Sequence, residues 1–283
     1  MSADILKTHL KKPDCLSLHS WNVAITWGRI ISTLNLNDQA TLLEIAPGHS
    51  PKVGFGLLLA HPQFCGTLYV LEPDAQALDK IENDYRRMFP NATIVGYAAT
   101  LEFIGDRLPQ GASLDLVLAN HPLDDMIIGR DFVAGNTEFT DYFTGMYQDG
   151  ATEAEKLANE AACWHALECG RPNDCARYKA EVVEDWTSFL SQLRPRFLVI
   201  AQYKSRTLQE YGVEAPDRLA LDVLNDLARR LPSMLLSTER ILIDQGFDSK
   251  RWIVADLCKQ VCHLPVIRCP SSPMLVRASS GAG

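Results

Sequence analysis

Two short apolar runs, each carrying an acidic residue near its end, constrain this chain most. The run from Leu42 to Ile45 includes Glu44 and leads through a Pro/Gly/Ser turn into an apolar segment of helical length. A second run, which begins at Leu68, ends at Glu72. This order is typical of a β-α-β unit that binds a nucleotide or nucleoside, because the turn presents backbone N–H groups and the acid accepts hydrogen bonds from a ribose diol. We therefore expect an adenosine-like ligand.

The order of these parts resembles the class I S-adenosylmethionine (SAM) dependent methyltransferases. In that family, an acid on the first strand precedes a small-residue loop under the methionine part of SAM, and an acid after the second strand holds the ribose. The resemblance assigns loop organisation to Glu44 and ribose binding to Glu72. The loop positions are Ala46, Gly48 and Ser50. Since the family usually has glycine at the first and third of these, we expect an unusually shaped methionine end of the pocket.

Two further residues join the predicted SAM-binding set. Pro73 follows the ribose acid directly, and Tyr97 stands where family members often carry an acid that contacts the adenine amino group. The resemblance therefore places Tyr97 against the adenine face. NAD fits less well than SAM, because the Gly-x-Gly-x-x-Gly spacing that cradles a pyrophosphate is absent.

Composition restricts the partners. The chain has 283 residues, 47% of them hydrophobic and 22% charged, with a net charge of -8 and no Lys/Arg-rich block. Clustered cations are the usual requirement for nucleic-acid binding, so we expect a small-molecule substrate and no nucleic acid. No run of about 18 apolar residues predicts a membrane span, and the first residues lack a signal-peptide core, so we expect a cytoplasmic protein. A homodimer is a possible assembly.

The cysteines do not predict a disulfide framework or a metal centre. A chain of this length with eight cysteines and no export signal is expected to keep them reduced. Cys163, Cys169 and Cys175 lie near His165, but zinc sites usually show tighter Cys pairs. We therefore predict no metal.

The fold class expected is α/β, a Rossmann-like class I methyltransferase fold. It has a mostly parallel seven-stranded sheet, helices on both faces and a helical lid insertion. Residues 1–40 form an N-terminal helical cap and residues 41–283 the SAM-binding domain, with a lid or substrate insertion at 121–195. Beyond the first two strands, the predicted strands are residues 92–95, 113–119, 196–202, 240–243 and 251–257. The last two form an antiparallel edge pair.

The turn after the predicted fourth strand should face the reacting centre, because ligands of open α/β sheets lie beyond the carboxyl ends of the strands. It carries Asn120, His121, Asp124 and Asp125. His121 is the candidate base, since an unperturbed histidine titrates near neutrality. Asn120 is predicted to act both in catalysis and in SAM binding. The structural alternatives are a turn residue for Asn120 and helix caps for the two aspartates.

Aromatic residues supply the remaining candidates. Tyr142, Tyr147 and Tyr178 on the insertion, with Tyr203 and Ser205 after the fifth strand, are expected to converge above the sulfonium, whose charge an aromatic face attracts. Tyr178 and Ser205 are the predicted catalytic pair among them. In the N-terminal helix, packing against the sheet is favoured over ligand contact for Trp21 and Trp27.

Three functions remain open at this point. The first is methyl transfer from SAM to a small acceptor. The second follows from a looser resemblance to SAM cyclases and aminocarboxypropyl transferases: the SAM amine attacks its own γ-carbon, giving azetidine-2-carboxylate and methylthioadenosine, with Asn120 or a lid tyrosine holding the ring-closing conformer. The third is a non-catalytic SAM-fold module that binds a partner through the patch at 163–165.

Overall fold

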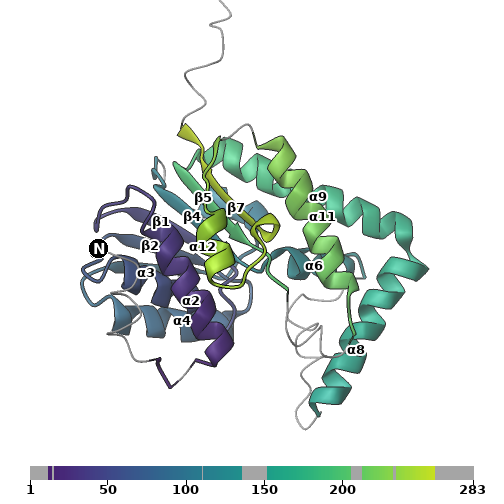
Figure 1. The fold of residues 1–283 in the computed structure, drawn as a ribbon. Coiled ribbons are helices and arrows are strands. Elements are labelled where there is room, and N and C mark those ends of the chain that lie inside the picture. Colours follow the sequence, from purple (N-terminus) through teal and green to yellow (C-terminus); the bar gives the residue numbers. More distant parts are fainter. Residues whose placement is uncertain are drawn as a thin grey trace, which may run out of the picture.

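The apolar runs of the sequence form one twisted sheet with helices on both faces (Figure 1). The computed structural model describes residues 12–14, 16–109, 111–135, 152–204, 212–231 and 234–258. The strands are β1 (Thr41–Ile45), β2 (Thr67–Leu71), β3 (Thr93–Tyr97), β4 (Leu116–Asn120), β5 (Phe197–Ala201), β6 (Met234–Leu235) and β7 (Trp252–Asp256). Their order is β3-β2-β1-β4-β5-β7-β6. The pairings from β3 to β5 are parallel, whereas β7 runs antiparallel to both β5 and β6.

The central strands are apolar because helices cover both of their faces. β4 and β5 are buried along their whole length, as is usual for parallel strands under two helical layers. The antiparallel β7 is buried along its whole length too. Successive side chains alternate between two hydrophobic clusters: Leu42 belongs to one, and Leu43 and Ile45 belong to the other. The alternation places Glu44 on the face of Leu42.

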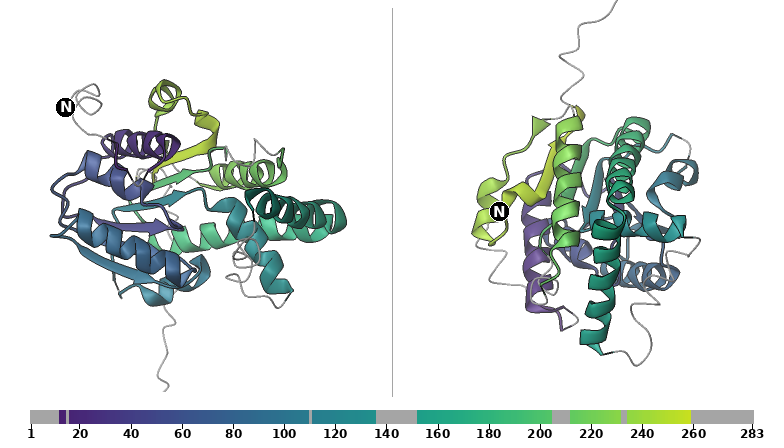
Figure 2. Two further views of the ribbon diagram at one scale, coloured as in Figure 1. Left: turned by 90° about the horizontal axis from the view of Figure 1, so that it is seen from below. Right: turned by 90° about the vertical axis from the view of Figure 1, so that its right-hand side faces the viewer.

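One helical layer contains α2 (Leu18–Ile31), α3 (Lys52–Ala60), α4 (Ala75–Met88) and the short α12 (Glu239–Asp244). The other contains α5 (Ile104–Arg107), α6 (Leu123–Ala134), α9 (Pro172–Leu193) and α11 (Ala215–Arg230). Figure 2 shows the two layers from two further directions. Local signals set several helix starts. Asp74 caps α4 by accepting from two backbone N–H groups, and Pro172 occupies the first turn of α9, where no donor is needed.

The segment predicted as an insertion has two parts. One packs on the sheet, and the other extends from the start of α9. α6 and α9 pack on the sheet and on each other. α8 (Glu153–His165) and the π-helical turn η2 (Ala166–Gly170) extend from the start of α9 (Figure 1). α8 begins at a capping box, in which Thr152 and Glu155 bond reciprocally. A lid role for α8 and η2 stays a prediction.

Most predicted elements are present, with one clear error. Residues 240–243, predicted as a strand, belong to helix α12. The strand that pairs with β7 is instead Met234–Leu235. Short apolar runs do not separate strand from helix by periodicity, and here Leu242 is buried while the adjacent Ile243 is 61% exposed. The other predicted strands are shifted by at most about three residues, which is common at element ends.

Two shorter turns complete the described fold. η1 (Leu101–Phe103) follows β3, and η3 (Ser249–Arg251) precedes β7. Across the ranges that the structure describes, no helix combines the length and apolar character needed to cross a bilayer.

Candidate cofactor and active site

The turn between β1 and α3 is held by Glu72. The backbone N–H of Gly48 donates to Glu72 Oε2 at 2.9 Å, and that of Asp74 donates to Oε1 at 3.1 Å. Gly48 has a positive φ of 61°, which glycine adopts without strain. Ala46 has a φ of 52°, so the chain keeps a left-handed backbone at a position where the family usually has glycine. The small-residue turn therefore exists despite its altered sequence.

Glu72 lies at the junction of two pockets. Its side chain is 6% exposed and lines neither of them, but its neighbour Pro73 lines one and Gly48 lines the other. Burial raises the pKa of this carboxyl, and the two backbone N–H groups partly offset the shift. Each carboxylate oxygen can accept a second hydrogen bond, so Glu72 retains acceptor capacity for a ribose diol.

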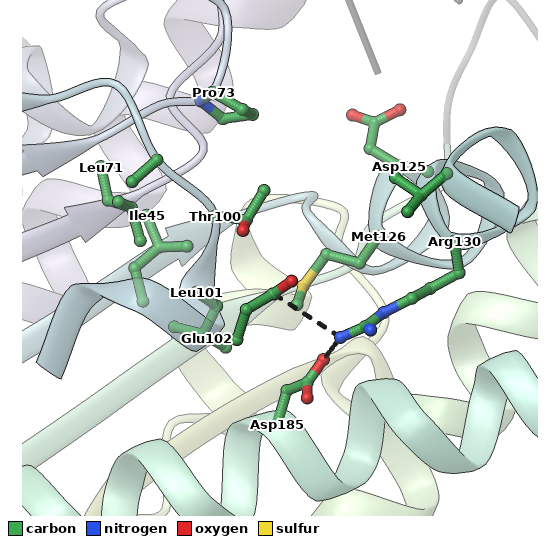
Figure 3. Close-up of a pocket in the computed structure, with 13 residues that line it drawn as sticks. Ile45, Leu71, Pro73, Thr100, Leu101, Glu102, Asp125, Met126, Arg130 and Asp185 are labelled. Carbon is green, nitrogen blue, oxygen red and sulfur yellow. Dashed lines mark hydrogen bonds and ion pairs between the residues drawn. The ribbon is translucent and has the colours of Figure 1, made fainter. Parts of the chain in front are cut away.

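The first pocket, which we call the apolar pocket, lies beyond the ends of β1 and β2, between η1 and α6 (Figure 3). Its apolar walls come from Ile45, Leu71, Leu101, Met126 and Val133. One edge is polar: Arg130 pairs with Asp185 on α9 and lies 3.5 Å from Glu102. An apolar slot with a carboxylate at its rim suits a flat heterocycle that carries an amino group.

The second pocket, the polar pocket, is formed by the 46–50 turn, the start of α2 and the ends of β4 and β5. Lys52, Asn120, His121 and Tyr203 project into it. Asp125 lines both pockets. The two pockets therefore adjoin along the carboxyl edge of the sheet.

A hydrogen-bonded chain of side chains crosses the floor of the polar pocket. The Trp27 indole N–H donates to Asn120 Oδ1 at 2.9 Å, and Asn120 Nδ2 donates to Tyr203 Oη at 3.2 Å. Lys52 Nζ donates to the same phenolic oxygen at 3.3 Å. Trp27 is fully buried, so its side chain packs in the core and orients Asn120 rather than facing the pocket.

The surroundings of His121 favour its protonated form, and its role as a base stays a prediction. Its Nδ1 lies 3.2 Å from Asp124 Oδ1. Burial would lower the pKa of His121, but the charge and hydrogen bond of Asp124 outweigh burial and raise it to about 10. A histidine that holds its proton at neutral pH cannot accept one from a substrate. His121 has a φ of 64°, and its backbone N–H donates to Ala201 O at 2.7 Å.

Buried and half-buried carboxyl groups lie around this ion pair. Asp124 also accepts from Gln202 Nε2 at 3.0 Å. Burial, together with the charge of Asp124, raises the pKa of Asp125 well above its usual range and that of Glu160 on α8 to about 7. One carboxylate therefore neutralises His121, while its neighbours tend to keep their protons.

Glu44 does not organise the turn as the resemblance implies. It is 1% exposed, its Oε2 accepts from Tyr85 Oη on α4 at 2.5 Å, and its Oε1 has no partner. Burial raises the pKa of Glu44 to about 8, with a smaller contribution from Glu72. The alternation of β1 points this carboxyl into the α4 side of the core, so Glu72 holds the turn instead.

The remaining predicted residues separate into three groups. Ser50 lines the polar pocket with Ala46 and Gly48. Tyr97 lines neither pocket, and its ring stacks on Tyr69 at 6.1 Å. Tyr178 is 3% exposed within the α9 core, so it does not reach the space above the turn. Ser205, Tyr142 and Tyr147 lie outside the described residues.

Several site residues were missed in the sequence or given no role there. Lys52 begins α3 directly after the turn, a position that could have been noticed. Glu102, Arg130 and Glu160 carry no local motif, because helix packing brings them to the site from separate elements. Within the described ranges, no group of three or more His, Cys, Asp or Glu side chains could hold a metal ion.

Comparisons with known proteins give only distant likenesses. No family model and no curated protein matches the chain. Among solved structures, a fibrillarin/Nop5p complex matches with 11% identity over 82% of each chain, at a TM-score of 0.40. A human methyltransferase 10 domain containing protein matches with 13% identity, over 90% of this chain and 92% of that chain, at 0.37. A geranyl diphosphate methyltransferase in complex with SAM matches with 11% identity, over 82% and 84%, at 0.30.

The strand order is therefore the firmer basis for classification. Helices cover both faces of a sheet in which β1 to β5 run parallel and β7 alone is reversed between β5 and β6. An acid-bearing β1 leads into the small-residue turn, and the acid after β2 bonds to that turn. With this topology, the chain has the fold of the class I SAM-dependent methyltransferases.

Proposed function

We propose that the chain binds SAM across the two adjoining pockets. The adenine occupies the apolar pocket, the ribose hydroxyls bond to Glu72 and the methionine part enters the polar pocket. The observation that carries the proposal is the position of Glu72, buried between an apolar slot and a polar pocket at the carboxyl edge of β1, β2 and β4. This is where open α/β sheets bind their ligands.

The residues present fit such a ligand chemically. Glu102 at the rim of the apolar pocket can accept from an exocyclic amino group. Lys52 in the polar pocket can pair with the carboxylate of the methionine part. Asp125, which lines both pockets, lies where the ligand would pass from one to the other.

We propose methyl transfer to a small-molecule acceptor as the reaction. Bound SAM supplies an electrophilic methyl group, so the residues of the site need only align the acceptor and exclude water. The start of α2 contributes Ser17, Leu18, His19 and Ser20 to the polar pocket, which closes one side of it. The acceptor would enter beside His121 and Tyr203.

Binding and product analysis test this function together. We expect SAM and S-adenosylhomocysteine to bind the purified protein in calorimetry. A mixture of candidate acceptors should then give S-adenosylhomocysteine, and SAM alone should give none. Formation of methylthioadenosine from SAM alone would contradict methyl transfer and indicate ring closure of SAM. Failure to bind either nucleoside would contradict the proposal and favour a non-catalytic module.

A further inference from the structure

Tyr203 stands out among the residues of the polar pocket, because its phenolic oxygen has hydrogen-bond partners that the sequence did not predict. It follows β5 and is 6% exposed. Phe247 and Trp252 pack around its ring, with centroid distances of 5.8 and 6.5 Å. The phenol end lines the polar pocket, so the ring is fixed while its oxygen faces the ligand space.

The hydrogen bonds at Tyr203 Oη determine which groups can accept the phenolic proton. An indole N–H only donates, so Trp27 fixes the amide oxygen of Asn120 and leaves Nδ2 for the phenol. A lysine ammonium also only donates, at 3.3 Å from the same oxygen. Tyr203 Oη therefore receives two hydrogen bonds from groups that cannot accept its proton. Among these contacts, no partner is left for the phenolic hydrogen, so it is free to exchange with a molecule in the pocket.

Lys52, His121 and the ring of His19 lie around Tyr203, and the charges that act on it come from Lys52 and His121. Lys52 comes from α3, and the His121 imidazolium follows β4 with its ring centroid 5.1 Å from that of Tyr203. His19 of α2 lies at 5.6 Å between ring centroids. Asp124 is directed toward His121 and Gln202. Burial would raise the pKa of Tyr203, but Lys52, His121 and the hydrogen bond from Asn120 outweigh burial and lower it.

We propose that Tyr203, as a phenolate stabilised by Lys52 and Asn120, is the general base of this site. The inference rests on the proposed use of SAM and specifies the acceptor class: a molecule whose nucleophilic atom carries a proton. That proton passes to Tyr203 Oη as the lone pair of the nucleophile forms a bond to the methyl carbon. The carbon–sulfur bond breaks and its electrons stay on sulfur.

This assignment fits the charges around the base. The charge and hydrogen bond of Asp124 favour the protonated form of His121, and the positive charge of that form favours a phenolate beside it. The same proton transfer would serve ring closure, since the SAM ammonium must lose a proton before its nitrogen can attack the γ-carbon. Tyr203 is therefore assigned as the base for either product.

Titration of the tyrosine absorbance tests the assignment without an acceptor. The chain contains eight tyrosines, so the difference between wild type and Tyr203→Phe isolates one of them. We expect a tyrosinate component that forms at lower pH than the remainder, is lost in Tyr203→Phe and moves to higher pH in Lys52→Met. Tyr69→Phe, which removes a tyrosine on the β3 side of the sheet, should keep the early component. Persistence of the early component in Tyr203→Phe, or its absence from wild type, would overturn the proposal.

Measuring SAM binding and product formation in the same variant distinguishes this inference from the proposed function. Tyr203→Phe should bind SAM with an affinity close to that of wild type, while formation of S-adenosylhomocysteine or methylthioadenosine falls by about 10²–10⁴-fold, the usual contribution of a general base. Undiminished turnover in Tyr203→Phe would overturn the assignment even if SAM binds. Absence of SAM binding to wild type would instead contradict the proposed function, and the absorbance titration would still decide whether Tyr203 ionises early.

Discussion

Glu44 lies on β1 and Glu72 directly follows β2, but their carboxyl groups accept hydrogen bonds from different parts of the fold. Glu44 enters the core beside Tyr85, whereas Glu72 accepts from the backbone of the turn and of Asp74. The sequence identified both acids and the ribose candidate, because each follows an apolar run. The resemblance assigned the turn to Glu44, whereas Glu72 holds it, because the face of β1 that carries Glu44 is covered by α4.

The buried Glu44 carboxyl should make stability depend on pH. Its pKa is raised from 4.5 to about 8 in the folded chain, so its favourable contribution is complete below about pH 4.5 and is lost as the pH rises through about 8. We expect the unfolding free energy of wild type, relative to Glu44→Gln, to fall across this window. Urea unfolding of both proteins at several pH values measures the difference. A constant difference would show that Glu44 is not a buried neutral acid.

His121 should titrate far above an ordinary histidine. With a folded pKa of about 10, its stabilising contribution is complete below about 6.5 and is lost as the pH rises through about 10. NMR of the imidazole ring should show a charged His121 throughout the neutral range. Asp124→Asn removes the charge partner, so the midpoint should move to lower pH. A neutral ring in wild type at neutral pH would support His121 as a candidate base.

At the scale of elements, close contact between α2 and α3 positions the pocket floor. A Cβ on Gly56 would lie 2.5 Å from Trp27 Cβ and 3.0 Å from Ala24 O. Only glycine therefore lets α2 approach closely enough for the Trp27 indole to reach Asn120. The aromatic stripe in the sequence predicted packing of this helix, but the bond to Asn120 joins residues 93 positions apart and has no local signal.

Gly56→Ala should separate these helices. We expect a loss of about 1–3 kcal/mol in unfolding free energy, because overpacking against the α2 backbone and the Cβ of Trp27 outweighs the better helix propensity of alanine. Thermal or urea unfolding measures the loss, and weakened ligand binding should accompany it. Gly170→Ala is the matched control, since a Cβ there meets nothing within 4 Å. Equal stability of both variants would contradict the close packing.

The elements themselves were largely predictable. Continuous apolar runs identified the buried strands. The prediction of a strand at 240–243 was wrong, because these residues form a short helix. Leu242 is buried there and Ile243 is exposed. The sequence alone does not distinguish such a short helix from a strand. The position predicted for Tyr178 was wrong for a related reason, because this residue lies on the face of α9 that is buried in the core.

At the scale of the whole molecule, the site follows from where the strands end. The parallel strands bring the residues after β1, β2 and β4 to one edge, so the 46–50 turn, Glu72 and Asn120 were predictable as neighbours. Arg130 and Glu160 were not predicted, because their approach depends on how helices pack around that edge, whereas Lys52 directly follows the turn and could have been noticed.

A ligand that bridges both pockets should stabilise the entire fold. Binding to the folded state alone adds about 2.7 kcal/mol at a ligand concentration 100 times the Kd. We therefore expect S-adenosylhomocysteine to raise the Tm in a concentration-dependent way in scanning calorimetry, whereas adenine alone, which fills only the apolar pocket, should raise it less. An unchanged Tm at saturating concentrations would show that the pockets do not bind this nucleoside.

Calorimetric titration of SAM into wild type and Glu72→Ala tests the central claim most directly. Removing the carboxylate takes away the ribose acceptor and the bond that holds Gly48, so we predict an affinity loss of at least about tenfold, the equivalent of about 1.4 kcal/mol. Glu184→Gln, on an exposed surface ion pair with Arg230, should bind as wild type does. Undiminished SAM affinity in Glu72→Ala, or no SAM binding by wild type, would contradict the account.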